Sequence, residues 1–298
     1  MQLELAEPAA AEPKELVQSP WRLAVRHFAR NPLAVAGLVF IAFVTLMALF
    51  APVIAPYKFD AIDLFNIKAP PSAQHWLGTD ELGRDELTRL LYGARVSLSV
   101  GLLATLLSTL IGLVVGAVSG YFGGWIDTIL MRFVEAMLSF PSLFLLIILA
   151  SLIPTGIDVK AMVLILGLFG WMGLARLIRA EFLAIKQKEY AEAAVALGVP
   201  TWRIMLRHFL PNALGVIIVS MTLGVGGNIL SESALSFLGV GIQPPTASWG
   251  NMLTNAQDYV WNAPWLAVWP GLAIFLTVLA FNFVGDGLRD AFDPHSKR

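Results

Sequence analysis

Long apolar stretches without a single charge constrain this chain more than any other feature of its sequence. Residues 32–56 and 96–126 contain no Asp, Glu, Lys or Arg. A helix needs about 20 mostly apolar residues to cross a bilayer core about 30 Å thick. Four further charge-free segments follow, at residues 136–157, 161–175, 212–231 and 259–285. The pattern predicts an all-α integral membrane protein with six transmembrane helices, the fourth of which must borrow flanking residues.

The composition supports a membrane protein and argues against several other classes. Only 14% of the 298 residues are charged, whereas an average soluble domain has about 25%. The chain has no cysteine and its four histidines are scattered, so neither a thiolate nor a histidine metal site is expected. The net charge of -1 gives no bias towards nucleic acid as a partner.

The distribution of Lys and Arg predicts the orientation of the chain in the membrane. With a cytoplasmic N-terminus, 14 of the 20 Lys and Arg residues lie in inner segments, where basic residues accumulate. The outer loop 240–264 has none, whereas the first outer loop departs from the rule with five. Both termini are therefore predicted to be cytoplasmic.

This topology divides the chain into five regions. The first twenty residues lack the basic start and apolar core of a signal peptide and are expected to be disordered. The regions are a cytoplasmic tail (1–31), the first transmembrane helix (32–56), an outer loop with a short amphipathic helix from residue 85 (57–95), a core with five transmembrane helices (96–287) and a second cytoplasmic tail (288–298).

A polar segment, EYAEAAVALGVPTWRIMLRHFLPN (residues 189–212), interrupts the core on the predicted cytoplasmic side. A helical wheel places one small, flat face on this segment, flanked by Glu189 and Glu192. The residues of this face are Tyr190, Ala193, Ala194 and Leu197. The segment is either an ordinary interfacial hairpin or a surface on which a partner protein docks.

The same segment contains signals for a turn and for a second helix. Gly198 stands where a left-handed residue is expected after a helix, and Pro200 blocks its continuation. A second helix is predicted at about residues 202–210. It carries Arg203, and Pro211 is expected to end it before the fifth span begins.

Four sequence motifs resemble one family of transport proteins. Glu192-Ala193-Ala194, then Gly198 and the run HFLP ending at Pro211, resemble the EAA motif of ABC importer permeases, although His208 replaces the usual isoleucine. HWLGTDELGRDELTRLLYGARVSLSVG (75–101), ALSFLGVGIQPPTASWG (234–250) and GDGLRDAFDP (285–294) resemble further signatures of the dipeptide/oligopeptide/nickel permeases. With NPLAVAGLVF at the first span, the resemblance covers nearly everything after residue 20, and the long N-terminal and first-loop pattern is similar to the C-type subunit.

The resemblance implies a MetI-like type I importer fold and a set of partners. In that family the EAA segment docks in a groove of a cytoplasmic ATPase. Glu189, Tyr190, Glu192, Ala193, Ala194, Leu197, Gly198, Arg203 and Pro211 are the candidate coupling residues. The implied partners are a B-type permease, two ATPases, an extracytoplasmic peptide-binding protein and the lipid of a bacterial cytoplasmic membrane. The implied function is to form half of the translocation pathway for di- or oligopeptides. The exact substrate, whether dipeptide, oligopeptide, nickel or another solute, is left open.

The chain lacks a motor of its own. It contains no G-x-x-x-x-G-K-[ST] phosphate loop. A non-catalytic subunit is therefore expected, with ATP and Mg bound by the partner ATPases and no cofactor in this chain.

The outer loop contains acidic residues that two interpretations explain. Asp80, Glu81, Asp85 and Glu86 are oxygen ligands of the type that hard cations prefer, but their spacing is not that of a calcium loop. The alternative is local capping, with Thr79 or Asp80 starting a helix and Arg84 pairing with an acid.

Polar and charged residues near the spans are candidates for a translocation pathway. Glu232, with Ser231 beside it and Asn228 one turn earlier, either lines a polar path or packs between helices. Ser139 and Phe140 precede Pro141, which predicts a kink or break beside the pathway.

Other charges and the outer tryptophans receive structural or docking roles. Arg132 is expected to pair with Glu135 one turn later. The charges at the inner end of the last span are expected to be structural or to face the ATPase; they are Asp286, Arg289, Asp290 and Asp293. The charged first outer loop (57–95) and the Trp-rich last outer loop, which contains Trp249, Trp261 and Trp265, are candidate docking surfaces for the binding protein. Trp265 and Trp269 are expected to be membrane-interface anchors.

Two other classes of membrane protein are alternatives to the permease interpretation. An ion-coupled secondary transporter usually has acidic residues at mid-span and inverted repeats, but most acids here lie at the ends of spans and no repeat is evident. A membrane enzyme needs a catalytic motif such as H-E-x-x-H or G-x-S-x-G, and neither occurs.

Overall fold

The computed structural model describes residues 20–153, 156–254 and 256–292. Within these ranges the only extended pairings are two isolated bridges, Thr79–Asp85 and Ile157–Ile242, so the all-α fold is confirmed. Four of the described helices are long and apolar enough to cross a membrane, and two bent helix pairs raise the number to six if each pair is one span. The six predicted spans agree with this upper number.

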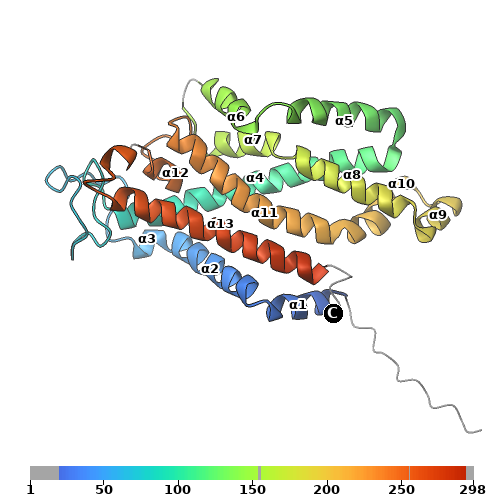
Figure 1. The fold of residues 1–298 in the computed structure, drawn as a ribbon, viewed down its shortest axis with the longest axis horizontal. Coiled ribbons are helices and arrows are strands. Elements are labelled where there is room, and N and C mark those ends of the chain that lie inside the picture. Colours follow the sequence, from blue (N-terminus) through green and yellow to red (C-terminus); the bar gives the residue numbers. More distant parts are fainter. Residues whose placement is uncertain (1–19, 154–155, 255, 293–298) are drawn as a thin grey trace, which may run out of the picture.

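The long helices lie side by side along the long axis of the molecule (Figure 1). The central helix, α4 (Glu86–Phe122), packs against α2 (Pro32–Leu49), α7 (Val159–Phe169), α8 (Met172–Lys186) and α11 (Leu210–Phe237). The short helix α9 (Glu189–Ala196) lies at one end of the bundle, and the loop before α4 lies at the other end (Figure 1).

The N-terminal region contains a helix where a tail was predicted. Within residues 1–31, the segment α1 (Pro20–Arg30) is helical, buries Ala24 and lies near the end of α13 (Trp265–Phe292). Asn31 then caps α2, its side chain accepting from the amide of Leu33 at 3.1 Å. The disordered tail predicted for the first twenty residues lies almost wholly outside the described residues.

The first span begins as predicted, and the second is longer. The first consists of α2 and the one-turn helix α3 (Ala51–Ile54). The predicted amphipathic helix from residue 85 and the second span form one helix, α4, of 37 residues. At 1.5 Å per residue this is about 55 Å, so one end of α4 extends well beyond a bilayer core.

Three glycines on one stripe let α4 and α8 approach closely. A Cβ at Gly116 would lie 2.5 Å from the carbonyl oxygen of Ala175, and one at Gly120 would lie 2.7 Å from Cβ of Phe182. Gly112 makes a similar approach to Trp171. The four-residue spacing is the small-residue packing pattern that membrane helices use, and our sequence analysis missed it.

The third predicted span is broken rather than kinked. α5 (Gly124–Leu138) and α6 (Ser142–Ser151) meet at an angle of 83° across residues 139–141. Pro141 precedes the first residue of α6, where its fixed φ and missing N–H are tolerated. The predicted break at this proline is confirmed. α5, however, begins twelve residues before the predicted start at residue 136, directly after the glycine turn at Gly123.

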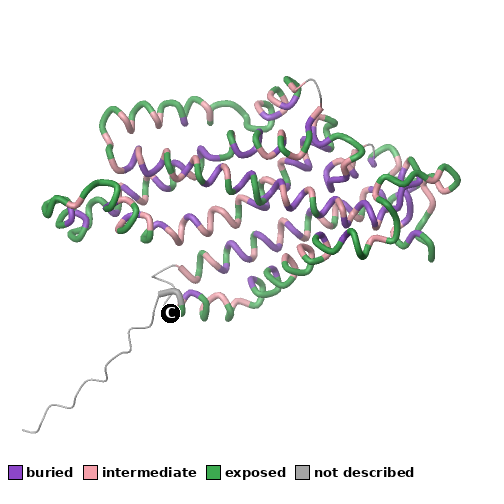
Figure 2. Tube along the Cα trace, turned by 180° about the vertical axis from the view of Figure 1, so that it is seen from behind, coloured by how far each residue is buried: buried purple, intermediate pink, exposed green. Residues whose placement is uncertain are grey.

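α5 is the most exposed of the long elements. Val134 is its one buried residue, whereas Trp125 and Ile129 are exposed by 74% and 59%. Figure 2 shows this exposed helix on the flank of the bundle. The predicted pair of Arg132 and Glu135 is confirmed, with 3.2 Å between Nη1 and Oε2. The fourth span is also bent, because α7 and α8 meet at 40°.

The prediction that Pro211 ends a short helix is wrong. α10 (Thr201–Ile204), the π-helical turn η1 (Met205–Phe209) and α11 form one continuous helix of 37 residues. The amide of Leu210 donates to the carbonyl of Met205, five residues back. This wider turn accommodates the proline, whose ring would crowd the carbonyl four residues earlier in a regular helix.

The last span is shifted towards the C-terminus relative to the prediction. Tyr259 belongs to the 3-10 turn η2 (Ala256–Tyr259), and α13 begins only at Trp265. α13 continues through Asp286, Arg289 and Asp290 to Phe292, so the predicted tail from residue 288 is at first helical. Asp293 lies outside the described residues.

Candidate coupling surface and polar cavities

The helix α9 ends in the predicted glycine turn. Gly198 has a φ of +73°, and the amide of Val199 donates to the carbonyl of Ala194 at 3.1 Å. This is the left-handed helix end that glycine permits. The next helix, α10, starts at Thr201 directly after Pro200.

One face of α9 is part of the protein core. Ala191 and Ala194 are exposed by only 2% and 7% and belong to a cluster with Phe182, Ile204 and Phe209. The prediction that Ala194 lies on the free face is therefore wrong. Ala194 stands at the edge of the predicted face on the helical wheel. It is buried because it packs in the same cluster as Phe182 of α8 and Phe209 of η1.

The opposite face of α9 is free in this chain. Leu197 and Tyr190 are exposed by 83% and 41%, and Glu189, Glu192 and Ala193 are also exposed. Most of the predicted face thus lies on the surface at the end of the bundle.

Aromatic and basic side chains fasten this end to the transmembrane helices. Lys186 Nζ donates to the carbonyl of Tyr121 at 2.8 Å, which joins α8 to the end of α4. The Tyr121 ring packs against Phe209, which in turn packs against Phe182 with 5.3 Å between ring centroids. These contacts join α8 to the end of α4 and to the η1 turn that leads into α11.

Arg203 lies beside α9 on the exposed surface of α10. Its guanidinium lies 5.2 Å from the centre of the neighbouring Trp202 ring. Among the described residues no ion pair involves Arg203. The side chains of Trp202 and Arg203 are therefore both available for contact with another molecule.

A bidentate ion pair that our sequence analysis did not predict joins α5 to α8. Arg179 Nε and Nη2 donate to the two carboxylate oxygens of Asp127 at 2.5 and 2.6 Å. Ser119 at the end of α4 also donates to this carboxylate. Charge-assisted forked pairs of this kind are strong and directional. The pair joins the exposed helix α5 to the rest of the bundle.

The structure places Glu232 inside the protein, so the prediction that it lines a path is wrong. Glu232 is 0% exposed. Its carboxylate accepts hydrogen bonds from Ser236 and Ser248 at 2.8 Å and from Ser97 at 3.1 Å. Ser97 also accepts from the amide of Trp249 at 3.1 Å. The carboxylate thus joins α4, α11 and the short helix α12 (Trp249–Met252), which is the packing role of the alternative interpretation.

Three of the four other pathway candidates line two adjacent cavities. One, of about 270 Å³, lies among α5–α8 and α11 and includes Phe140 in its lining. The second, of about 290 Å³, lies among α4, α8 and α11 and is lined by Thr105, Ser108 and Thr109. Asn228 and Ser231 line both. Ser139 lines neither and donates to the carbonyl of Ala136 in its own helix.

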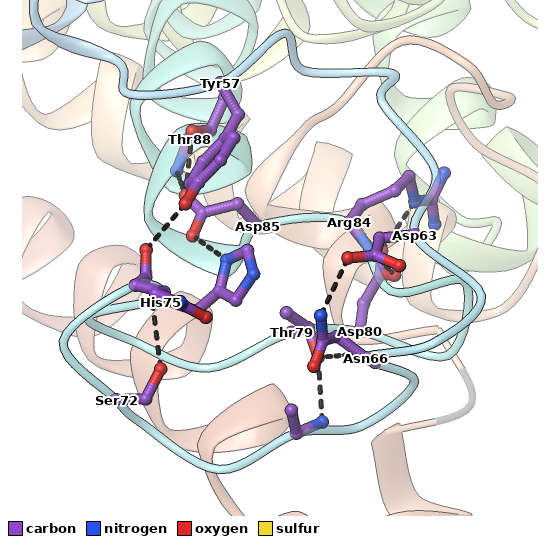
Figure 3. Close-up of polar contacts among 12 residues, drawn as sticks. Tyr57, Asp63, Asn66, Ser72, His75, Thr79, Asp80, Arg84, Asp85 and Thr88 are labelled. Carbon is purple, nitrogen blue, oxygen red and sulfur yellow. Dashed lines mark hydrogen bonds and ion pairs between the residues drawn. The ribbon is translucent and has the colours of Figure 1, made fainter.

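The outer loop is held together by its own polar residues (Figure 3). Asp80 pairs with Arg84 at 2.6 Å, as predicted for Arg84 and an acid. Asp85, rather than Thr79 or Asp80, caps the following helix, accepting from the amide of Thr88 at 2.8 Å. Asp85 also bonds to Nδ1 of His75 at 2.9 Å.

The acidic residues of this loop do not converge on one point. Arg84 and His75 occupy the carboxylates of Asp80 and Asp85, and no cluster of three potential metal ligands occurs among the described residues. Nearby, a hydrogen bond from the Asn66 side chain at 2.7 Å lowers the pKa of Asp63. The structure therefore favours capping and local pairing as the explanation for the loop's charges.

The tryptophans expected at the outer face have different environments. Trp249 is 2% exposed and donates to the carbonyl of Leu90, so this residue of the last outer loop is not available to a partner. Trp265 donates to the carbonyl of Thr79 at 3.2 Å and thus joins α13 to the outer loop. Trp261 is 93% exposed and remains available to a partner.

Comparison with known proteins identifies the family. Residues 112–298 match the family model described as binding-protein-dependent transport system inner membrane component. Residues 19–71 match the N-terminal TM domain of oligopeptide transport permease C.

Characterised relatives match along nearly the whole chain. The dipeptide transport system permease protein of Alkalihalophilus pseudofirmus is 40% identical over 98% of this chain and 96% of its own length. The oligopeptide transport system permease protein of Haemophilus influenzae is 42% identical over 94% of this chain and 90% of its own length. The glutathione transport system permease protein of Escherichia coli O157:H7 is 42% identical over 94% of this chain and 92% of its own length.

These relatives are all permease proteins of transport systems, so the alternative of an ion-coupled secondary transporter is not supported. The similarity also confirms the resemblance that the sequence motifs indicated. The chain belongs to the family of binding-protein-dependent transport system inner membrane components, as a multi-pass ABC importer permease.

Proposed function

We propose that this chain forms half of a pathway that imports di- or oligopeptides, and that α9 receives the force of ATP hydrolysis from a cytoplasmic ATPase. The observation that carries the proposal is the division of α9 into two faces. Ala191 and Ala194 are built into the core, while Tyr190, Ala193 and Leu197 are exposed. A helix anchored on one side and free on the other can dock on a partner and pass on its movement.

Three features support the proposed complex. The two cavities lie among helices that cross the membrane, and a second permease subunit would supply the facing half of the pathway. The relatives named above transport dipeptides, oligopeptides or glutathione, which makes peptides the favoured substrate. The exposed Trp261 and Phe65 of the outer loops offer aromatic contacts to an extracytoplasmic binding protein.

The arrangement also suits a non-catalytic subunit with both termini in the cytoplasm. α1 and the end of α13 lie towards the same half of the bundle as α9 (Figure 1). With α9 in the cytoplasm, ATP and Mg would be bound by the partner ATPases and this chain would need no cofactor.

Two variants test the coupling role. In proteoliposomes with the whole complex, Glu192→Lys reverses a charge on the free face, and Gly198→Asp puts an acidic side chain at a position with φ +73°. Both are expected to lower ATP-dependent peptide uptake at least about tenfold while the ATPases keep hydrolysing, because a misplaced or repelled α9 loses its contact. Glu181→Lys in α8 makes the same charge reversal outside the free face of α9 and should retain uptake. Unchanged uptake in the Glu192 and Gly198 variants would refute the coupling role.

A further inference from the structure

The wall shared by the two cavities carries polar groups but no charge. Gly170, Asn228 and Ser231 line both cavities, so a solute that moves from one to the other passes them. No Asp, Glu, Lys, Arg or His occurs among the described residues that line either cavity.

The hydroxyl groups of this wall are satisfied within their own helices. Ser231 Oγ donates to the carbonyl of Gly227 at 2.9 Å, and Thr105 Oγ1 donates to the carbonyl of Gly101 at 2.7 Å. Asn228 Nδ2 donates to Thr105 Oγ1 at 2.9 Å and so joins α11 to α4. A hydroxyl oxygen also has two acceptor lone pairs, so the wall can bind backbone amides without presenting a fixed charge.

Two charged side chains near the linings, those of Glu232 and Arg179, are held by partners outside the cavities. Glu232 follows Ser231 directly, yet it is 0% exposed and its carboxylate is taken up by three serine hydroxyls. In α8, Arg179 is paired with Asp127 outside both linings. Both of these charges are thus held by partners outside the two linings.

From this arrangement we infer that the shared wall at Asn228 and Ser231 passes peptides without sorting them by the charge of their side chains. The inference rests on the proposed function. A peptide carries both terminal charges and side chains of either sign, and a fixed charge here would repel one class. Serine, threonine and asparagine bind the backbone that all peptides share.

A test can place a charge at this shared wall after the protein has folded. The chain has no cysteine, so Ser231→Cys introduces a single thiol into it. This change removes only the hydrogen bond within α11. The reconstituted complex is labelled with a sulfonatoethyl or a trimethylammonioethyl methanethiosulfonate, which adds a negative or a positive group. Uptake is then measured for trialanine and for its variants with a central glutamate or lysine.

The negative label should lower uptake of the glutamate peptide at least about fivefold more than that of the lysine peptide, and the positive label should do the reverse. For each label, the ratio of glutamate-peptide uptake to lysine-peptide uptake is compared with the same ratio in the wild-type complex treated with the same reagent. Ser151→Cys is the matched control, because Ser151 is exposed on α6 and lines neither cavity. Its labelling should leave the ratios unchanged. Ser220→Cys repeats the test from the second cavity if the Ser231 variant assembles poorly.

Two results would overturn the inference. One is stoichiometric labelling, verified by mass spectrometry, that leaves the ratio of glutamate to lysine peptide at the wild-type value. The other is an equal loss for all three peptides, which would show a narrow site insensitive to charge. Absence of ATP-dependent uptake of any peptide by the unlabelled wild-type complex would instead contradict the proposed function.

Discussion

Single residues in this protein take their roles from their surroundings more than from their type. Ser231 and Glu232 are neighbours in sequence, but one lines two cavities and the other is enclosed by hydroxyl groups. Ala193 and Ala194 are likewise adjacent, and only Ala193 is exposed. Residue type and position along the chain could not separate either pair, because each separation depends on which helix packs behind the residue.

Replacement of Glu232 by an apolar residue should destabilise the folded protein. Glu232→Leu leaves the hydroxyls of Ser97, Ser236 and Ser248 without their acceptor in a buried place. We expect a loss of about 2–4 kcal/mol in the free energy of unfolding, since each buried unsatisfied group costs about 1–3 kcal/mol. Thermal unfolding in detergent measures it. Ser231→Ala, which removes one bond within a helix, should have almost no effect; an equal loss in both variants would contradict the role of the serine cage.

Elements of the fold are joined by small residues and by few polar links. The stripe of Gly112, Gly116 and Gly120 allows α4 to contact α8, whereas α5 depends on Asp127 and Arg179 for its strongest polar contact with α8. The sequence showed where helices begin and end to within several residues in most cases. It did not show these contacts, because they join residues more than 50 positions apart.

The close approach of α4 and α8 should not tolerate a side chain at Gly116. Gly116→Val places carbon atoms against the carbonyl of Ala175, where a Cβ alone would come within 2.5 Å. Overpacking of this kind costs about 1–3 kcal/mol or more, so folded yield and the thermal midpoint should fall. Gly173→Ala in α8, where nothing lies within 4 Å of the added carbon, is the control and should be neutral. A Gly116→Val protein as stable as this control would exclude tight packing.

The pair of Asp127 and Arg179 should respond to a charge exchange. Asp127→Arg alone or Arg179→Asp alone places like charges side by side and should lower stability by about 1–2 kcal/mol, a value reduced by partial exposure. The double exchange restores an ion pair between the same elements and should recover at least half of this loss. A double-mutant cycle on the thermal midpoint measures the coupling. Strictly additive effects would mean that the two side chains do not stabilise each other.

At the scale of the whole molecule, the two proposed docking surfaces lie at opposite ends of the helical bundle. α9 lies at one end and the outer loop at the other (Figure 1), which is the arrangement needed to connect a cytoplasmic motor with an extracytoplasmic delivery protein. α1 and the end of α13 lie towards the α9 half (Figure 1), and the basic-residue count predicts that this half faces the cytoplasm.

Thiol labelling of whole cells can test the orientation directly. Because the chain has no cysteine, Ala73→Cys in the outer loop and Ala196→Cys at the end of α9 each add one thiol at an exposed position. A membrane-impermeant maleimide should label Ala73→Cys in intact cells and Ala196→Cys only after permeabilisation. Labelling in the reverse order would place α9 outside the cell and contradict the ATPase contact.

By itself, the sequence determined the membrane class, the approximate position of the spans, the break at Pro141 and the glycine turn at Gly198. These features follow from local properties: apolar length sets insertion into lipid, and proline and glycine set the backbone. Only the tertiary structure decided which face of α9 is free, that the helix runs on through Pro211, and that Glu232 is enclosed. The Glu232 cage alone joins Ser97 to a residue 135 positions away. Contacts between residues so far apart in sequence depend on how the helices pack, and a local sequence pattern does not predict that packing.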